Sequence, residues 1–262
     1  MATTYFNGKY LVGEEIALPA IGHPWLRGDC AFETLRTEGS TIYFLQRHLR
    51  RLNESIASMG FESADQYEIE YVARKLMAQS SNSDIGRLRI TCFSNGDLLI
   101  THESAKSAST NIKIGIYPIV RPSTTQLIHA KNGSYAAPAS ALRWAHKEGY
   151  DDVLFVNEKG NIAEATFANV GFVIGGELLT PTLDSGCLPG IVRQVALEIF
   201  PNFREADISR EQGLQAESVF TLSSIREIQF AESIAGRKLK VGRLLTDLRD
   251  AFLAHAQANP NS

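Results

Sequence analysis

The stretch LIHAKNGSYAAP, from Leu127 to Pro138, holds the most informative lysine of this 262-residue chain. Lys131 is one of nine lysines, and it lies between a segment of strand character and a predicted helix instead of on a charged face. A lysine that is buried among small and apolar residues stays neutral and becomes a candidate nucleophile toward carbonyl compounds. On this stretch alone, the alternative is an exposed loop lysine without a chemical role.

The composition excludes several classes of protein. Hydrophobic residues make up 44% and charged residues 21% of the chain, which are ordinary values for a globular protein and exclude global disorder. The formal net charge of −3 lacks the basic excess that nucleic-acid-binding proteins carry. The histidines and cysteines form no close ligand spacing such as HExxH or CxxC, so we expect no metal site.

The sequence also carries expectations about location. No cationic segment followed by an apolar core opens the chain, and no apolar run approaches the roughly 20 residues that cross a bilayer. Cys30, Cys92 and Cys187 are odd in number and far apart, which is typical of buried, reduced thiols. We therefore expect a cytoplasmic protein whose partner is a small molecule, not a membrane or a nucleic acid.

Local patterns predict a mixture of strands and helices. Asn7-Gly8 and Asn95-Gly96, each between strand-like segments, predict hairpin turns. Apolar residues at helical spacing predict a helix from Leu45 to Met59 that Gly60 ends. Further helices are expected over about 64–80, 136–148 and 241–256, and after the Leu188-Pro189-Gly190 segment. Strands of mixed length between these helices indicate α+β lobes instead of one continuous parallel sheet.

A longer pattern follows Lys131. Tyr135 and the segment GYDDV (149–153) precede GNIAEATFAN (160–169), in which Glu164 stands 33 residues after Lys131 and starts an ExxxxN spacing. In combination these motifs resemble the fold-type IV pyridoxal-phosphate enzymes, the class IV aminotransferases. This family includes branched-chain and D-amino-acid aminotransferases and aminodeoxychorismate lyase. The resemblance covers nearly the whole chain.

The resemblance implies a two-lobed α+β fold with a small N-terminal α/β lobe and a larger C-terminal α/β lobe that has a barrel-like sheet. From the small polar residues near 105–111 and from Arg121-Pro122, we expect an N-terminal lobe over 1–112, a linker over 113–124 and a C-terminal lobe over 125–262. The C-terminal lobe is expected to bind the cofactor.

The resemblance also implies the cofactor, pyridoxal 5′-phosphate, and three contacts to its ring. Lys131 would bind the cofactor aldehyde, Glu164 would contact the pyridine nitrogen, and Tyr135 would reach the phenolic oxygen. A carboxylate beside that nitrogen keeps it protonated, so that the ring draws electrons from the substrate. The alternatives are an ordinary strand-end glutamate and a core tyrosine.

The cofactor phosphate has three candidate binding segments. Arg51, in HLRRL (48–52), matches the family's phosphate-binding arginine, and a guanidinium can hold a phosphate through two parallel hydrogen bonds. LPGIVR (188–193) resembles a helix start whose backbone N–H groups meet the phosphate, which points to Ile191 and Val192. Val192 replaces the family's threonine. A solvent-exposed arginine is the alternative for Arg51. The turn after FTLS resembles the last phosphate-binding turn, which adds Ser224 and Ser223, with plain turn serines as the alternative.

Arg89 is the candidate for substrate binding. It matches a position where family members present an arginine to a substrate carboxylate, although Arg87 and Arg89 share a strand face and both could face solvent. The resemblance implies a homodimer, and in that case we expect Arg89 to act across the dimer interface.

Two reactions fit these residues. We expect a 4-amino-4-deoxychorismate lyase, which eliminates pyruvate to give 4-aminobenzoate, because the chain is short and because its serine-rich turn and Val192 depart from the aminotransferase pattern. The alternative is an amino-acid aminotransferase of the branched-chain or D-amino-acid type. The segment GHPWLRGDC (22–30) departs from the family's DRG-xxx-GDG pattern, and this puts the identity of the substrate in doubt.

Overall fold

The computed structural model describes residues 2–13, 16–18, 21–62, 64–79, 85–105 and 111–261. The chain divides into two compact units. Unit 1 comprises Met1–Ser107, Ala130–Tyr135 and Asn259–Ser262, and unit 2 comprises Ala108–His129 and Ala136–Ala258. Each unit has its own sheet and its own hydrophobic core.

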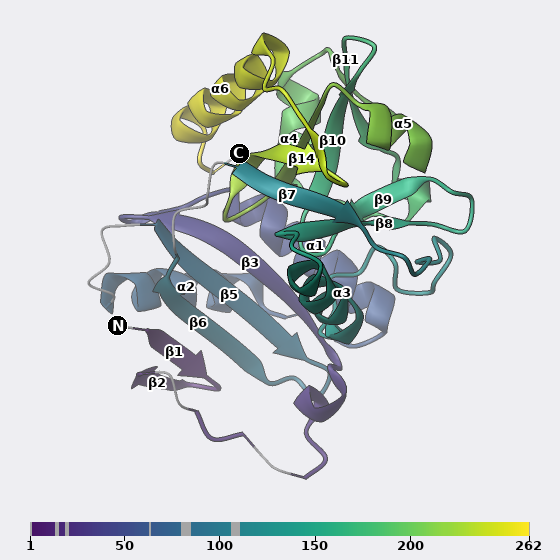
Figure 1. Ribbon diagram of the computed structural model, residues 1–262. Coiled ribbons are helices and arrows are strands. Elements are labelled where there is room, and N and C mark those ends of the chain that lie inside the picture. The colour runs from purple at the N-terminus through teal and green to yellow at the C-terminus, as the bar shows by residue number, and fades with distance from the viewer. Residues whose placement is uncertain are drawn as a thin grey trace. The chain divides into compact units, whose positions relative to one another are not determined.

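Unit 1 is built on a six-stranded antiparallel sheet with the order β2-β1-β6-β5-β3-β4 (Figure 1). Both predicted hairpin turns are confirmed. Asn7 and Gly8 have φ values of 42° and 87° between β1 and β2, and Gly96, with φ of 89°, closes the turn from β5 to β6. The strands are β1 (Thr3–Phe6), β2 (Lys9–Val12), β3 (Cys30–Glu38), β4 (Thr41–Ile42), β5 (Ile85–Phe93) and β6 (Leu98–Ser104).

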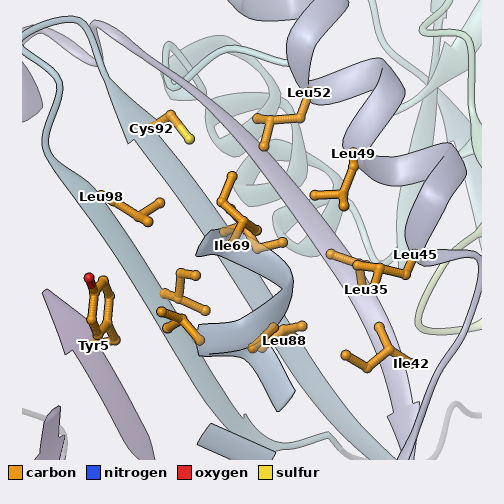
Figure 2. Packing of buried hydrophobic residues seen from close by; sticks show 14 of the residues in the cluster. Tyr5, Leu35, Ile42, Leu45, Leu49, Leu52, Ile69, Leu88, Cys92 and Leu98 are labelled. Carbon is orange, nitrogen blue, oxygen red and sulfur yellow. The ribbon is translucent and has the colours of Figure 1, made fainter. Parts of the chain in front are cut away.

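Two helices cover one face of this sheet. Helix α1 (Leu45–Met59) ends at Gly60 as predicted, because Gly60 takes the left-handed conformation with φ of 79°. Helix α2 (Gln66–Gln79) begins two residues later than expected. Figure 2 shows apolar side chains of α1 pointing toward those of β3 and β5, so the core of unit 1 lies between helix and sheet. A short 3-10 helix, Pro24–Arg27, precedes β3.

The opposite face of the same sheet carries polar and aromatic side chains. Because side chains alternate along a strand, Ala31 and Leu35 face the helices whereas Phe32 and Thr34 face the other way. Arg89 pairs with Thr34 across the β3–β5 ladder and therefore belongs to this second face. The sheet thus has an apolar face that packs against the helices and a second face with polar and aromatic side chains.

The segment Ala130–Tyr135 is part of unit 1, which differs from the expected C-terminal lobe over 125–262. Phe32 N donates to Lys131 O at 2.9 Å and Gly133 N donates to Cys30 O at 2.8 Å, so the segment pairs with the edge of β3. The expected linker over 113–124 also differs, since β7 (Asn111–Ile116) runs into it and pairs with β8 and β14. These differences arise because the local amino-acid composition does not predict which distant segments pair through their backbones.

Unit 2 is built on a nine-stranded mixed sheet that is curled into a half-barrel. Its order is β12-β11-β10-β13-β14-β7-β8-β9, with β15 paired to β14. Across the curl, Ala165 N at the end of β9 donates to Ala168 O just before β10. The remaining strands are β8 (Asp152–Val156), β9 (Ile162–Ala165), β10 (Asn169–Ile174), β11 (Glu177–Pro181), β12 (Phe203–Ala206), β13 (Ser218–Ser223), β14 (Glu227–Ile234) and β15 (Arg237–Lys238).

Four helices belong to unit 2. They are α3 (Ala136–Lys147), α4 (Ile191–Ile199), α5 (Arg210–Gln215) and α6 (Arg243–Ala258), with a 3-10 turn at Leu183–Ser185. Helix α4 begins directly after Gly190, as the sequence predicted. Both units combine strands with helices, so the predicted α+β fold with a barrel-like second sheet is confirmed. Within the described residues, no helix is long and apolar enough to span a membrane.

Candidate active site

Lys131 is held by contacts at its backbone and at its amine. Lys131 N donates to Ser55 Oγ of α1 at 3.0 Å, and its carbonyl accepts from Phe32 in β3. Its Nζ donates to Tyr135 Oη at 3.1 Å and lies 4.5 Å from the centroid of the Phe32 ring. No carboxylate of the described residues forms an ion pair with it. The lysine is therefore half-buried and oriented, which argues against the exposed loop lysine.

Arg89 lies against the same phenyl ring as Lys131. Its guanidinium carbon is 3.8 Å from the Phe32 ring centroid, and its Nε donates to Thr91 Oγ1 at 3.3 Å. Burial lowers the pKa of Arg89, which forms no ion pair with a described carboxylate. Arg87, in contrast, is exposed and pairs with Glu103, so the two arginines do not both face solvent.

This arrangement favours an Arg89 that acts within its own chain, whereas the resemblance led us to expect action across a dimer interface. Arg89 and Lys131 of one chain meet at Phe32, because the β3–β5 register places Arg89 next to Phe32 on one face of the sheet. The lysine segment joins the edge of β3 at the same level. Arg89 and Lys131 of one chain therefore flank the same aromatic ring.

Arg51 forms part of a buried charge cluster with Glu33 and His48. Arg51 Nε and Nη2 donate to the two carboxylate oxygens of Glu33, each at 2.7 Å, and His48 Nδ1 is 2.7 Å from Glu33 Oε2. Burial by itself would raise the pKa of Glu33, but the charge of Arg51 and these hydrogen bonds hold it well below its usual range. Arg51 is therefore not the solvent-exposed arginine of the alternative; Glu33 fixes its orientation and engages two of its five N–H groups.

Glu164 is the centre of the corresponding cluster in unit 2. It is 8% exposed, and its two carboxylate oxygens have different partners. Oε1 accepts from Arg121 Nη1, and Oε2 accepts from the backbone N–H of Leu188 at 2.9 Å. Glu164 lies in β9 and is bound to the LPG segment that leads into α4. It is therefore more than an ordinary glutamate at the end of a strand.

Asn169 explains the ExxxxN spacing. Its Nδ2 donates to Leu188 O at 2.8 Å, so Glu164 and Asn169 bind the N–H and the carbonyl of the same residue. A Cβ atom added at Gly190 would lie 1.9 Å from Asn169 Oδ1, so a larger residue there would displace the side chain that binds Leu188. Together these contacts set the start of α4, where the first backbone N–H groups lack carbonyl partners within the helix.

The remaining predicted phosphate contacts lie in the same part of unit 2. Ile191 and Val192 are buried in the first turn of α4. Ser223 ends β13 and Ser224 begins the turn to β14, and both are partly buried. The β10–β13 register pairs Asn169 with Leu222, the residue before Ser223. One residue, Asn169, therefore connects the α4 start with the serine turn.

Each unit carries groups that suit pyridoxal phosphate by their chemistry. The amine of Lys131 suits an aldehyde, the hydroxyl of Tyr135 suits a phenolic oxygen, and the carboxylate of Glu164 suits a pyridine nitrogen. Backbone N–H groups at the start of α4 suit a phosphate dianion. The chemistry of the residues present fits the cofactor. Among the described residues, no group of three or more His, Cys, Asp or Glu side chains could hold a metal ion.

Sequence reasoning missed Glu33 and Arg121. A signal for Glu33 exists, because a carboxylate between Ala31 and Leu35 faces an apolar core and must therefore have a cationic partner. For Arg121 there is no such signal, since its partner Glu164 is 43 residues away in the sequence.

Comparison with known proteins now identifies the family. A sequence model of the family described as "Amino-transferase class IV" matches residues 30–234. The chain belongs to this family. Class IV aminotransferases are enzymes that depend on pyridoxal phosphate, so the expectations about enzyme class and cofactor are confirmed.

Curated relatives of this class IV aminotransferase cover most of its length. The branched-chain-amino-acid aminotransferase of Escherichia coli strain K12 is 23% identical over 91% of this chain and 87% of its own. The D-alanine aminotransferase of Bacillus licheniformis is 22% identical, with 90% of each chain covered. These relatives favour the aminotransferase alternative over the aminodeoxychorismate lyase that we expected first.

Solved structures confirm the fold. A branched-chain aminotransferase from Thermoproteus uzoniensis, determined with norvaline, superposes with a TM-score of 0.90 at 20% identity over 98% of this chain and 95% of that one. A hypothetical aminotransferase from Mycobacterium tuberculosis in its PLP-bound form gives a TM-score of 0.89 at 20% identity, covering 99% and 100%. The assignment of individual site residues stays a prediction.

Proposed function

We propose that the protein is an amino-acid aminotransferase that moves an amino group from an amino acid to a 2-oxo acid. One observation carries this proposal: Lys131 Nζ and the Arg89 guanidinium lie 4.5 and 3.8 Å from the centroid of one phenyl ring, that of Phe32. An amine and a guanidinium placed together suit a molecule that carries both a reactive amino carbon and a carboxylate. The aminotransferase relatives support the same reaction.

When bound, pyridoxal phosphate supplies an aldehyde that condenses with amines and a ring that accepts electrons from the bond being broken. Lys131 Nζ is the proposed acid and base: it takes the proton from the substrate Cα and returns one to the carbon that receives the amino group. The hydroxyl of Tyr135, 3.1 Å away, orients that amine. Lys131 is thus the proposed catalytic residue.

The other residues are proposed to bind. Glu164 would accept a hydrogen bond from the protonated pyridine nitrogen, and the N–H groups of Ile191 and Val192 would bind the phosphate, as would Arg51, Ser223 and Ser224. Buried Glu33 keeps Arg51 in one rotamer through two hydrogen bonds. Arg89 would bind a carboxylate of the substrate.

The test of this function compares two neighbouring arginines. Arg89→Leu removes the proposed carboxylate partner, whereas Arg87→Leu removes a guanidinium that is exposed and paired with Glu103. We expect Arg89→Leu to reduce kcat/KM for amino acids about 10- to 100-fold, as for the loss of a charged hydrogen bond. Arg87→Leu should stay within about threefold of wild type, since an exposed ion pair contributes little.

The assay uses L- and D-amino acids with 2-oxoglutarate, and also aminodeoxychorismate with detection of 4-aminobenzoate. Transamination that depends on Lys131 and Arg89 supports the proposal. Release of 4-aminobenzoate without transamination would overturn it in favour of the lyase. Loss of the lysine-linked cofactor absorbance in Lys131→Ala, with folding retained, separates the catalytic role of Lys131 from a structural one.

We also propose that the enzyme is a homodimer in the cytoplasm. Unit 1 presents exposed apolar side chains on α2 and on its edge strand β2, among them Tyr67, Tyr71 and Val12, which are 88%, 65% and 71% exposed. Symmetric pairing of two copies is the commonest way in which soluble proteins cover such residues.

A further inference from the structure

Arg121 is a charged residue without a role in the reaction described above. Its guanidinium donates through Nη1 to Glu164 Oε1, and its carbon lies 5.2 Å from the centroid of the Phe155 ring in β8. Its backbone is fixed as well, since Arg121 N donates to Val156 O at 2.9 Å. Two residues later, Ser123 N and Oγ donate to Glu158 at 2.8 and 2.7 Å. Both the side chain and the backbone of Arg121 are therefore held in place.

We propose that Arg121 is a positioning residue that acts through Glu164 and fixes the carboxylate plane for the pyridine nitrogen of the cofactor. The proposal rests on the role assigned to Glu164 under the proposed function. Arg121 itself does not touch the cofactor in this scheme; it binds the one Glu164 oxygen that the backbone of Leu188 does not bind.

The geometry of the carboxylate explains why one contact is not enough. With Leu188 N alone, Glu164 could rotate about its last side-chain bond, which has a broad torsional preference. A second donor on the other oxygen removes that freedom. Each carboxylate oxygen accepts about two hydrogen bonds, so Arg121 and Leu188 leave acceptor capacity for a ring N–H.

Arginine suits this task better than other donors. Its guanidinium is planar and always charged, so it binds Glu164 and stacks on Phe155 at the same time. The side chains of Arg121 and Glu164 are 27% and 11% exposed, so solvent screens the pair less than it screens a surface pair. Loss of the arginine would leave a largely buried carboxylate with a single neutral donor.

A double-mutant cycle tests this proposal through cofactor binding instead of activity. The apo forms of wild type, Arg121→Met, Glu164→Gln and the double variant are titrated with pyridoxal phosphate by equilibrium dialysis. We expect Arg121→Met to weaken binding about 10- to 100-fold, as for a hydrogen bond to a charged group. In the Glu164→Gln background the same change should add less than about twofold, because the two residues act as a unit.

Three further measurements separate positioning from general stability. Arg204→Met removes an exposed arginine that pairs with Glu177 in the same unit, and it should leave cofactor affinity unchanged. The ¹⁵N chemical shift of the bound pyridine nitrogen should move toward the unprotonated form in Arg121→Met, and Arg121→Lys should recover part of the affinity. If Arg121→Met does not fold, Arg121→Lys and Arg121→Gln complete the cycle.

The outcomes distinguish two failures. If Glu164→Gln binds the cofactor like wild type, the role of Glu164 itself is wrong and the proposed function must be revised. If Glu164→Gln weakens binding while Arg121→Met does not, or if their effects add fully, Arg121 does not act through Glu164 and the present proposal is overturned.

Discussion

At the scale of single residues, the most consequential contacts are those of buried charges. Glu33 is 0% exposed and Arg51 is 5% exposed, so neither charge could persist without the other. His48 completes the cluster: burial lowers its pKa, so a neutral ring donates Nδ1–H to Glu33 near pH 7. A buried ion pair of this kind orients its members more than it stabilises the fold.

Replacing Glu33 with glutamine should destabilise the protein by about 3–5 kcal/mol, because Arg51 would keep a buried charge without its carboxylate. The Arg51 guanidinium and its hydrogen bonds lower the pKa of Glu33 from 4.5 in spite of burial, so the stabilisation by this carboxylate is present above about pH 4.5 and is lost as the pH falls below it. Urea unfolding of wild type and Glu33→Gln between pH 3 and 7 measures this. The difference in unfolding free energy should narrow toward acid pH; a constant difference would contradict the assignment.

At the scale of elements, the start of α4 depends on two side chains from outside the helix. Glu164 binds the N–H of Leu188 and Asn169 binds its carbonyl, so the proposed partner of the ring nitrogen and the proposed phosphate-binding helix start are connected through Leu188. The LPG segment has no side-chain N-cap of its own, since Gly190 occupies that position. The position of the LPG segment is therefore set by its contacts with Glu164 and Asn169.

Gly190→Ala should displace this helix start, since the new Cβ would lie 1.9 Å from Asn169 Oδ1. We expect the affinity for pyridoxal phosphate to fall at least about tenfold, while the affinity for pyridoxal, which lacks the phosphate, changes much less. Fluorescence titration of both ligands measures this. Gly242→Ala is the matched control, because a Cβ there meets nothing within 4 Å. Equal losses for both ligands would show that the helix start does not bind the phosphate.

Elements with local signals could be predicted from the sequence, and those that depend on distant partners could not. Asn7-Gly8 and Gly60 act through their own backbone conformations, so the hairpin and the end of α1 are visible in the sequence. Lys131 and Glu164 were found through a resemblance of motifs. Arg121 and the place of Ala130–Tyr135 in unit 1 follow from pairing across many residues, which no local pattern encodes.

At the scale of the whole molecule, the arrangement of unit 1 decides how a dimer would behave. Because Lys131 and Arg89 of one chain contact the same Phe32 ring, each chain carries both of the residues that we propose to bind the substrate. A dimer would then hold two active sites that do not exchange these groups. Dimerisation would then stabilise the protein and cover exposed apolar side chains, but it would not supply Lys131 or Arg89 to the site of the other chain.

Sedimentation at micromolar concentration should give about twice 28.8 kDa. We expect no gain in activity when inactive Lys131→Ala is mixed with Arg89→Ala and the mixture is assayed at low substrate concentration. No site in a hybrid dimer would contain both wild-type residues, so the mixture should be no more active than Arg89→Ala alone. Exchange between differently tagged copies, followed by pull-down, serves as the control for mixing. Recovered activity would show that the two groups come from different chains.

The pairing of the Lys131 segment with β3 links the position of the proposed catalytic lysine to the completion of a sheet. Until residues 130–133 have been synthesised, the edge of β3 at Cys30–Phe32 has backbone N–H and carbonyl groups without these partners, and open strand edges invite aggregation. The ribosome must add some hundred residues after β3 before that edge can close. The same backbone pairing therefore covers the edge of the first sheet and fixes the position of Lys131.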